Sequence, residues 1–216
     1  MNETTNDDDD AGKITALQDQ VKKRKSSKSL AQELLETLLL TLILFAITRF
    51  SVQNYEVQGV SMLPTLQDQE RILVDKVSYL FRVPPRGDIV VFKYPNDTSR
   101  NFIKRVIGDP GDKIMVVPVH GVYHVFVNGK MLNEPYIKEA PNTPYPYNCT
   151  SIKTCVPHIV PPDHIFVMGD NRTESFDSRD WGDLPLKDMI GHAIISYWPI
   201  SHLSFLPNQY SYASSK

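Results

Sequence analysis

The feature that most limits how this chain can fold is the apolar run Leu34–Phe50, in which Leu, Ile, Phe and Ala dominate. Its part without charge, Thr37–Thr48, is shorter than the roughly 20 residues that a membrane span needs. Extended to Leu30–Val52, the run is long enough to span if the charged side chains near its ends reach the headgroups. We therefore expect a membrane anchor over residues 30–52.

Charged residues border the apolar run on both sides. Glu33 and Glu36 would lie at headgroup level, and Arg49 would extend its side chain to the opposite interface. A basic cluster precedes the run and consists of Lys22, Lys23, Arg24, Lys25 and Lys28. Because basic residues stay on the cytoplasmic side, we expect the polar tail 1–29 in the cytoplasm and residues 53–216 on the other side.

A cleaved signal peptide and a buried core helix are the two alternatives to an anchor. A cleaved signal peptide needs small residues at its cleavage site, and Phe50–Tyr55 contains no Ala-x-Ala sequence. A core helix would have a polar face, and Leu38–Ile47 has almost none. Both observations favour an uncleaved anchor.

The chain after the apolar run has the pattern of a β protein. Short runs of β-branched and aromatic residues alternate with turn sequences such as Asp109–Asp112 and Asn128-Gly129. The expected strands are Tyr55–Gln58, Arg71–Asp75, Asp88–Tyr94, Phe102–Ile107, Lys113–Val119, Val122–Val127, His164–Met168 and Gly191–Trp198. Sixteen prolines against ten glycines suit sheet edges and stiff loops better than a helical bundle. We expect a mostly β fold with an antiparallel sheet or barrel-like domain.

Residues 133–162 interrupt the strand pattern, since they hold seven of the prolines and both cysteines. We expect a small Pro-rich, cap-like excursion from the sheet there. Cys149 and Cys155 are close enough for a disulfide, half of a metal site or a chance pair. No second Cys or His pair stands at ligand spacing, so we expect no metal. If this part lies outside the cytoplasm, a disulfide is favoured.

The overall charge argues against broad nucleic-acid binding. The formal net charge of the 216 residues is −2, so there is no general basic field to neutralise phosphates. The length allows one domain of ordinary size with appendages.

A serine on a shaped turn follows the apolar run after about ten residues. Ser61 stands between Gly59-Val60 and Met62-Leu63-Pro64-Thr65. Pro64 fixes its φ angle, and Gly59 allows the backbone to pass close to another chain. A serine held in this way is a candidate nucleophile. An ST-turn or a helix N-cap would explain the same residues.

A lysine in apolar company follows further along the chain. Lys104 lies in the strand Phe102–Ile107, where it shares one face with Phe102 while Ile103 and Arg105 share the other. Apolar surroundings lower the pKa of a lysine by up to about 3–5 units when burial is complete. Such a lysine can act as a general base, whereas a lysine on a solvated edge strand cannot.

A third polar segment, Gly169–Asp180, follows the strand His164–Met168. Its many hydrogen-bond donors and acceptors at a strand end could order a site. A polar surface loop would have a similar composition.

Together these segments resemble the bacterial type I signal peptidases, membrane-anchored Ser-Lys endopeptidases that remove signal peptides from exported proteins. The resemblance rests on the anchor, Gly59–Leu66, Arg86–Phe92, Phe102–Asp112 and Gly169–Arg179, which occur in the order of the family. It implies a serine endopeptidase without a cofactor. It also implies a bacterial inner-membrane protein whose catalytic domain lies on the extracytoplasmic, periplasmic side.

Carried over to this sequence, the resemblance makes Ser61 the nucleophile and Lys104 the general base. Ser175 takes the position of a serine that orients the lysine amine. The supporting ion-pair positions are Arg105, Asp170, Asp177 and Arg179. The backbone N–H of Ser61 would stabilise the oxyanion, and Gly59 stands where some members place a second donor, a serine hydroxyl.

The resemblance also implies substrates and partners. The substrates would be exported preproteins with signal peptides, cut where small residues stand at positions −1 and −3. The enzyme would be held by the lipid bilayer, near the protein-export translocon. Shallow pockets for these small residues would be lined by Met62, Leu66, Phe102, Ile103, Tyr55, Val57, Ile72 and Val91. We expect Cys149 and Cys155 to form a loop disulfide without a chemical role.

Two other functions remain open from the sequence. A self-cleaving repressor-type protease uses the same Ser-Lys chemistry on a related β fold, but it would carry a DNA-binding domain in place of an anchor. A membrane-tethered binding module without catalysis would leave Ser61 and Lys104 far apart.

Overall fold

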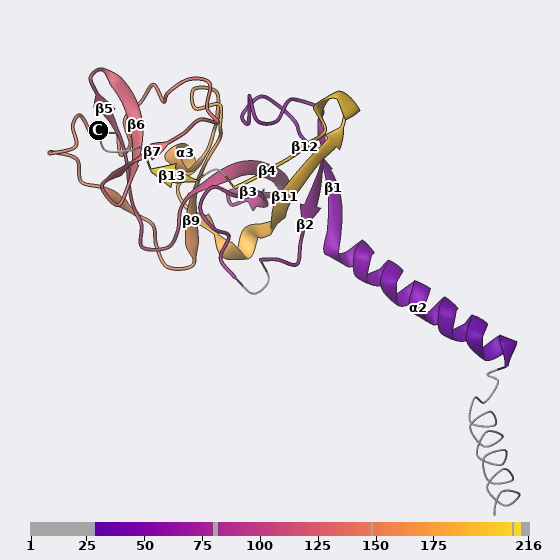
Figure 1. Ribbon diagram of the computed structural model, residues 1–216. Helices are drawn as coiled ribbons and strands as arrows, with labels where there is room; N and C mark the ends of the chain where they lie inside the picture. Colours follow the sequence, from indigo (N-terminus) through magenta and orange to yellow (C-terminus); the bar gives the residue numbers. More distant parts are fainter. Residues whose placement is uncertain (1–28, 80–81, 148, 209, 213–216) are drawn as a thin grey trace, which may run out of the picture. The chain divides into compact units, whose positions relative to one another are not determined.

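The structure, a computed structural model, describes residues 29–79, 82–147, 149–208 and 210–212. The chain forms two compact units, one ending at Ile47 and the other beginning at Thr48. Most of helix α2 (Leu30–Ser51) belongs to the first unit, and all described strands belong to the second (Figure 1). Apart from Ser29, the expected polar tail 1–29 lies outside the described residues.

Helix α2 begins with a capping box and exposes its apolar side chains. The Ser29 N–H donates to Gln32 Oε1 at 3.2 Å, and the Gln32 N–H donates to Ser29 Oγ at 3.3 Å. The large side chains along the helix are exposed, Leu34 by 64% and Phe50 by 76%. Among the residues that the structure describes, α2 is the one helix long and apolar enough to cross a membrane. It is a candidate membrane span by length and composition.

The larger sheet of the second unit is entirely antiparallel. Its strands are paired in the order β1-β2-β11-β3-β4-β9-β10, and β12 pairs with β11. These strands are β1 (Val52–Glu56), β2 (Arg71–Asp75), β3 (Ile89–Tyr94), β4 (Asp97–Gly108), β9 (His164–Met168), β10 (Leu184–Pro185), β11 (Met189–Trp198) and β12 (Ser204–Phe205). Strand β3 is central and buried on both faces, because Ile89 and Val91 pack into one apolar cluster while Val90 and Phe92 pack into another.

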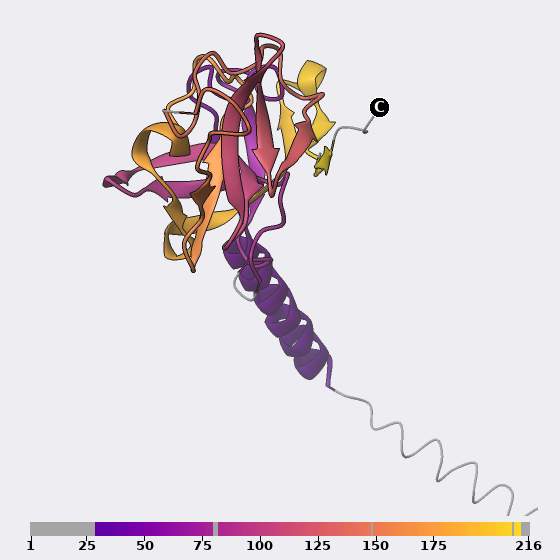
Figure 2. The same ribbon diagram turned by 90° about the vertical axis from the view of Figure 1, so that its left-hand side faces the viewer.

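A smaller antiparallel sheet lies at the opposite end of this unit from β1 and β2 (Figure 1). It consists of β13 (Ser211–Tyr212), β7 (Lys130–Asn133), β6 (Val122–Val127), β5 (Lys113–Val119) and β8 (His158–Ile159), paired in that order. Figure 2 views the unit from the side of this sheet. An apolar cluster that includes Ile107, Val116 and Phe166 joins it to β4 and β9 of the larger sheet. The remaining short helices are α3 (Ser178–Trp181), η1 (Leu186–Asp188) and η2 (Ile200–His202).

The Pro-rich excursion packs against the smaller sheet. Tyr145 forms two backbone hydrogen bonds with Val116 on β5, of 2.7 and 2.9 Å. Cys149 and Cys155 form a disulfide, and Cys149 is fully buried beside Met115 and Phe126. Of the alternatives that the spacing left open, the structure contains the disulfide.

The mostly β, antiparallel body with one N-terminal apolar helix is confirmed. Residues 133–162 do not form a separate cap. They contribute β8 to the smaller sheet, which also contains β5, β6 and β7. Strand β4 begins at Asp97 and not at Phe102, because its polar first half pairs with the end of β3. The strands of two to four residues were not expected, since a segment this short has no alternating pattern.

Candidate active site

Ser61 lies on a turn that is tied down from both sides. The φ angle of Gly59 is +89°, a conformation that favours glycine, and its N–H donates to Asp68 Oδ1 at 2.7 Å. After the serine, Met62 and Leu66 are almost fully buried in the apolar cluster below the turn. The hydrophobic core therefore fixes the turn, while Ser61 itself stays partly exposed.

Lys104 reaches Ser61 from β4. Its Nζ donates to Ser61 Oγ at 2.7 Å and to the backbone carbonyl of Ile103 at 3.0 Å, and it lies 5.4 Å from the centre of the Phe102 ring. Strand β9 pairs with β4 only from Arg105 onward, so none of the described strands covers this edge of β4 at Lys104. The Lys104 amine and the Ser61 hydroxyl meet beside this unpaired edge of β4.

The surroundings of Lys104 favour the neutral amine. Only 4% of the residue is exposed. Burial is the main cause that lowers the pKa of Lys104 to about 8 from its usual 10.5, and the positive charge of Arg179 adds to it. The carboxylates of Asp177 and Asp170 act in the opposite direction. A substantial fraction of the amine is therefore neutral near pH 8.

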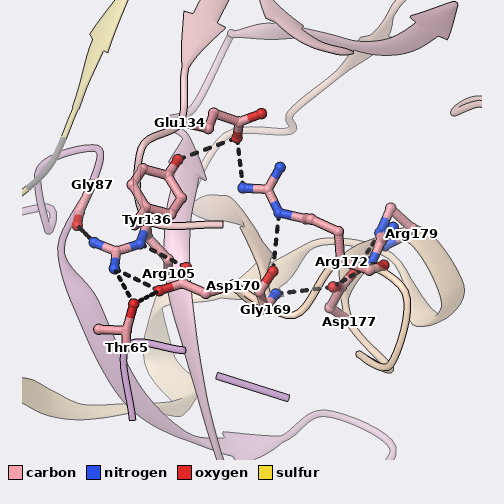
Figure 3. A network of polar contacts seen from close by, with 10 residues as sticks. All are labelled: Thr65, Gly87, Arg105, Glu134, Tyr136, Gly169, Asp170, Arg172, Asp177 and Arg179. Carbon is pink, nitrogen blue, oxygen red and sulfur yellow. Dashed lines mark hydrogen bonds and ion pairs between the residues drawn. The ribbon is translucent and has the colours of Figure 1, made fainter. Parts of the chain in front are cut away.

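The loop after β9 is joined to β4 by a buried ion pair (Figure 3). Arg105 donates from Nε to Asp170 Oδ1 at 2.8 Å and from Nη2 to Asp170 Oδ2 at 2.6 Å. The same arginine donates to the Gly87 carbonyl at 2.7 Å, and the Thr65 hydroxyl donates to Asp170. Because both charged side chains are almost fully buried, this bidentate pair fixes the loop relative to the Ser61 turn and Lys104.

A second ion pair closes the same loop. Asp177 caps α3 and accepts hydrogen bonds from Arg179 Nε at 2.8 Å and from the Gly169 N–H at 3.0 Å. Arg179 also donates to the Arg172 carbonyl at 2.8 Å. All four expected supporting residues, Arg105, Asp170, Asp177 and Arg179, thus belong to the network that shapes this loop.

Ser175 packs against Gly169 and does not hydrogen-bond to Lys104. Its hydroxyl is buried and has no hydrogen-bond partner among the described residues. A β-carbon on Gly169 would collide with both the Ser175 hydroxyl and the Ser61 carbonyl oxygen, so each of these groups packs closely against Gly169. The expected bond between Ser175 and the lysine amine is not formed in this arrangement.

Three further residues of the polar network were not predicted from the sequence. Arg172 donates to the Gly169 carbonyl at 3.0 Å, and its Nη2 lies 2.6 Å from Glu134 Oε1 (Figure 3). The Tyr136 ring lies under the Arg105 guanidinium at 4.1 Å. Arg172 stands inside the polar segment that the sequence singled out. Glu134 and Tyr136 come from the Pro-rich excursion, and no local pattern connects them with that segment.

A groove of about 720 Å³ leads to Ser61 and Lys104. Of the expected pocket residues, those that line it are Tyr55, Val57, Ile72, Val91, Phe102 and Ile103. Met62 and Leu66 do not line it, since their side chains point into the core and are only 1% and 0% exposed. The lining residues that were not expected are Asn54, Glu56, Gln58, Val60, Ser99, Arg100, Asn101, Glu174 and Phe176.

The backbone around Ser61 offers one expected oxyanion donor. Within the described residues, no acceptor takes the Ser61 N–H. The Gly59 N–H is already bound to Asp68, so it is not available as a second donor. No group of three His, Cys, Asp or Glu side chains in the described part of the chain could hold a metal ion.

Comparison with known proteins identifies the family. The family model for signal peptidase, peptidase S26, matches residues 30–198, which is most of the chain. The chain belongs to this signal peptidase family. The family assignment makes it a serine endopeptidase.

Several signal peptidases are similar to this chain over most of both sequences. A protein described as "Probable signal peptidase I-2" from Synechocystis sp. is 38% identical over 192 residues, 86% of this chain and 81% of the relative. A signal peptidase I from Leptolyngbya laminosa is 36% identical over 187 residues, 82% and 85%. A signal peptidase I from Bacillus caldolyticus is 36% identical over 160 residues, 72% and 85%. The resemblance inferred from the sequence motifs is confirmed.

We expect the Gly169→Ala substitution to impair this signal peptidase, because the new methyl group would push the Ser61 backbone away from Lys104. A displacement of this kind should lower kcat about 10- to 100-fold. Gly191→Ala is a matched control, since its β-carbon would collide with the Asp75 carbonyl on β2. Steady-state cleavage and thermal unfolding of both variants test this: the control should lose stability but keep its kcat. Wild-type kcat in Gly169→Ala would show that the contact is unimportant.

Proposed function

We propose that this protein is a membrane-anchored signal peptidase in which Ser61 is the nucleophile and Lys104 the general base. The observation that carries the proposal is the 2.7 Å hydrogen bond between Lys104 Nζ and Ser61 Oγ at the groove, with the amine buried and its pKa lowered. A serine is activated when an adjacent base accepts its proton, and a buried lysine meets that need without a histidine.

The reaction follows from this pair. Ser61 Oγ bonds to the scissile carbonyl carbon while its proton passes to the neutral Lys104 amine. The Lys104 ammonium then protonates the leaving amine, so the C–N bond breaks and an ester to Ser61 remains. Lys104, neutral again, accepts a proton from water as that water attacks the ester. The ammonium returns the proton to Ser61 Oγ as the carboxylic acid product leaves. The Ser61 N–H stabilises the negatively charged oxygen of the tetrahedral intermediate that forms in each of the two attacks.

The groove suits an extended peptide with small side chains. Strand β1 pairs only with β2 in the described part of the chain, so its other edge can pair with a peptide strand, as can the edge of β4 at Lys104. The apolar lining residues Val57, Ile72 and Val91 are almost fully buried, so they leave only shallow pockets. Residues −1 and −3 of a signal peptide, which are small, would fill these pockets.

The anchor determines where the enzyme acts. In our proposal residues 30–52 span a bacterial inner membrane, with the tail 1–29 in the cytoplasm and the catalytic domain 53–216 on the periplasmic side. The exposed apolar length of α2 supports the span, and the disulfide supports an oxidising compartment. The enzyme would meet preproteins in the lipid bilayer as they leave the translocon.

The catalytic proposal is tested with a purified preprotein. The detergent-solubilised enzyme should remove the signal peptide, and N-terminal sequencing of the product should place the cut after a small residue. Ser61→Ala should be inactive but should still fold. Release of a product by Ser61→Ala at the wild-type rate would refute the role of Ser61. Cleavage of the enzyme's own chain in place of the preprotein would support the repressor-type protease.

The topology is tested by adding protease to intact spheroplasts. Digestion should reach the residues after 52 and should spare an epitope placed before residue 30. Thiol labelling under denaturing conditions should find Cys149 and Cys155 blocked until a reductant is added. A protected body with two free thiols would put the catalytic domain in the cytoplasm, where signal peptides are not removed.

A further inference from the structure

Asn171 holds the two carbonyl groups that flank the Ser61 nitrogen and α-carbon. Its side-chain Nδ2 donates to the Val60 carbonyl at 3.1 Å, and its backbone N–H donates to the Ser61 carbonyl at 3.0 Å. Val60 O also accepts a bond from the Leu63 N–H at 3.1 Å, which closes the turn. One residue of the loop after β9 thus makes two bonds to two successive peptide groups of the nucleophile turn.

These two bonds determine the geometry of Ser61. The Val60 carbonyl and the Ser61 N–H belong to the same planar trans peptide, so they point in opposite directions. When Asn171 holds the carbonyl on one side, the Ser61 N–H has to point to the other. No described residue accepts a hydrogen bond from that N–H, so it stays available to a substrate oxygen.

The second bond completes the constraint. The two peptide planes on either side of Ser61 define its φ and ψ angles, and these angles determine the direction of the Cα–Cβ bond. Fixing both planes therefore fixes the Ser61 β-carbon, which carries the hydroxyl, as well as the direction of its N–H. The Lys104 amine lies 2.7 Å from that hydroxyl, within hydrogen-bond distance.

Asn171 is itself held in position. The Thr173 hydroxyl donates to Asn171 Oδ1 at 3.4 Å, which leaves the Nδ2 group facing Val60. The Glu174 N–H donates to the Asn171 carbonyl at 3.2 Å, and the preceding residue, Asp170, forms the buried pair with Arg105. The Arg105–Asp170 ion pair therefore helps to fix the position of Ser61, because Asn171 follows Asp170 directly and bonds to the peptide groups on both sides of Ser61.

We infer that Asn171 is a positioning residue for the cleavage reaction, whose side-chain amide orients the oxyanion donor, the Ser61 N–H. This inference rests on the proposed role of Ser61. A preorganised donor acts on the oxyanion of the transition state and hardly on the bound ground state. Loss of the orienting amide should therefore lower kcat more than it changes KM.

The test uses Asn171→Asp and Asn171→Ala in the full-length protein. Asn171→Asp keeps the shape but places an acceptor against the Val60 carbonyl, so its kcat should fall about 10- to 100-fold. Asn171→Ala should lose less, because the turn bond from Leu63 remains. The pH midpoint of kcat/KM should stay at the wild-type value in Asn171→Ala, since Lys104 keeps its surroundings, whereas the added carboxylate of Asn171→Asp should move the midpoint upward, as the carboxylates of Asp170 and Asp177 do. Asn133→Asp is a matched control, because the Asn133 amide donates to Ser211 in the smaller sheet; its kcat should not change.

A binding measurement separates positioning from general damage. Binding of an uncleaved signal peptide should be the same in Ser61→Ala and in Ser61→Ala/Asn171→Asp, because the groove is intact. Weaker binding in the double variant in proportion to the loss of kcat would overturn the inference and leave a structural role only. A wild-type kcat in Asn171→Asp would also overturn it. If Ser61→Ala is inactive in the same assay, that result leaves the proposed function standing. If Ser61→Ala cleaves normally, the proposed function itself fails.

Discussion

Replacing Lys104 with Met is expected to abolish cleavage and at the same time to make the folded protein more stable at pH 7. The variant has no amine to accept the Ser61 proton, so kcat/KM should fall by about 10⁴-fold or more. The loss should be specific to the chemical step, because Met fills a similar volume beside Phe102 and leaves the groove intact.

The gain in stability follows from the pKa of the buried amine. The pKa of Lys104 is about 8 in the folded protein and about 10.4 in an unfolded chain, so the unfolded state binds the proton more tightly. Below pH 8 this difference lowers the free energy of unfolding by about 3 kcal/mol, and the penalty disappears as the pH rises to about 10.4. After the loss of two hydrogen bonds, each worth about 1 kcal/mol, Lys104→Met should still be more stable by roughly 1 kcal/mol at pH 7.

Denaturant titrations at pH 7 and pH 10 measure this difference. Lys104→Met should be more stable than the wild type at pH 7 and less stable than the wild type at pH 10, where most of the burial penalty has disappeared but the two hydrogen bonds are still lost. Lys113→Met, on an exposed position of β5, controls for loss of a lysine charge in general. A Lys104→Met protein that is less stable than the wild type at pH 7 would mean that the amine is not destabilised by burial.

Asp170→Asn should be the most destabilising conservative substitution in the site. It would leave the Arg105 guanidinium buried without its charge partner, which typically lowers stability by about 3–5 kcal/mol. The double variant Arg105→Met/Asp170→Leu removes both charges and should be much more stable than the two single losses predict. Chemical unfolding of Arg105→Met, Asp170→Leu and the double variant in a double-mutant cycle measures the coupling. Additive losses would show that the pair contributes little.

The same substitution has a second expected effect. The Asp170 carboxylate raises the pKa of Lys104, so its loss should lower that pKa. The pH midpoint of cleavage by the folded fraction of Asp170→Asn should therefore lie below the wild-type midpoint. An upward shift would contradict the electrostatic account of the site.

The main strands and the proximity of Ser61 to Lys104 could be predicted because short sequence patterns carry them. Strand β5 has an apolar run from Ile114 to Val119, the run in β6 is interrupted only by His124, and the turn and strand motifs of this family are contiguous in the sequence. The exposure of the apolar side chains of α2 also agrees with the near absence of polar residues over Leu38–Ile47.

What could not be predicted depends on long-range packing. Met62 and Leu66 have the apolar character of pocket residues, and only the packing of the turn on β2 and β3 puts them in the core. Glu134 and Tyr136 reach the polar network from the Pro-rich excursion through Arg172 and Arg105. Ser175 illustrates a further limit, because its position was predicted but its missing hydrogen bond was not.

The dependence of kcat/KM on pH tests the central claim most directly, since it reports the ionisation of the free enzyme. If neutral Lys104 is the base, cleavage should rise along a single limb with a midpoint near pH 8, where the pKa of the buried amine lies. Competitive chemical labelling of Lys104 in Ser61→Ala should titrate with a similar midpoint. A rate that stays constant between pH 6 and pH 10, or a Lys104 that titrates near 10.5, would contradict the assignment of the base.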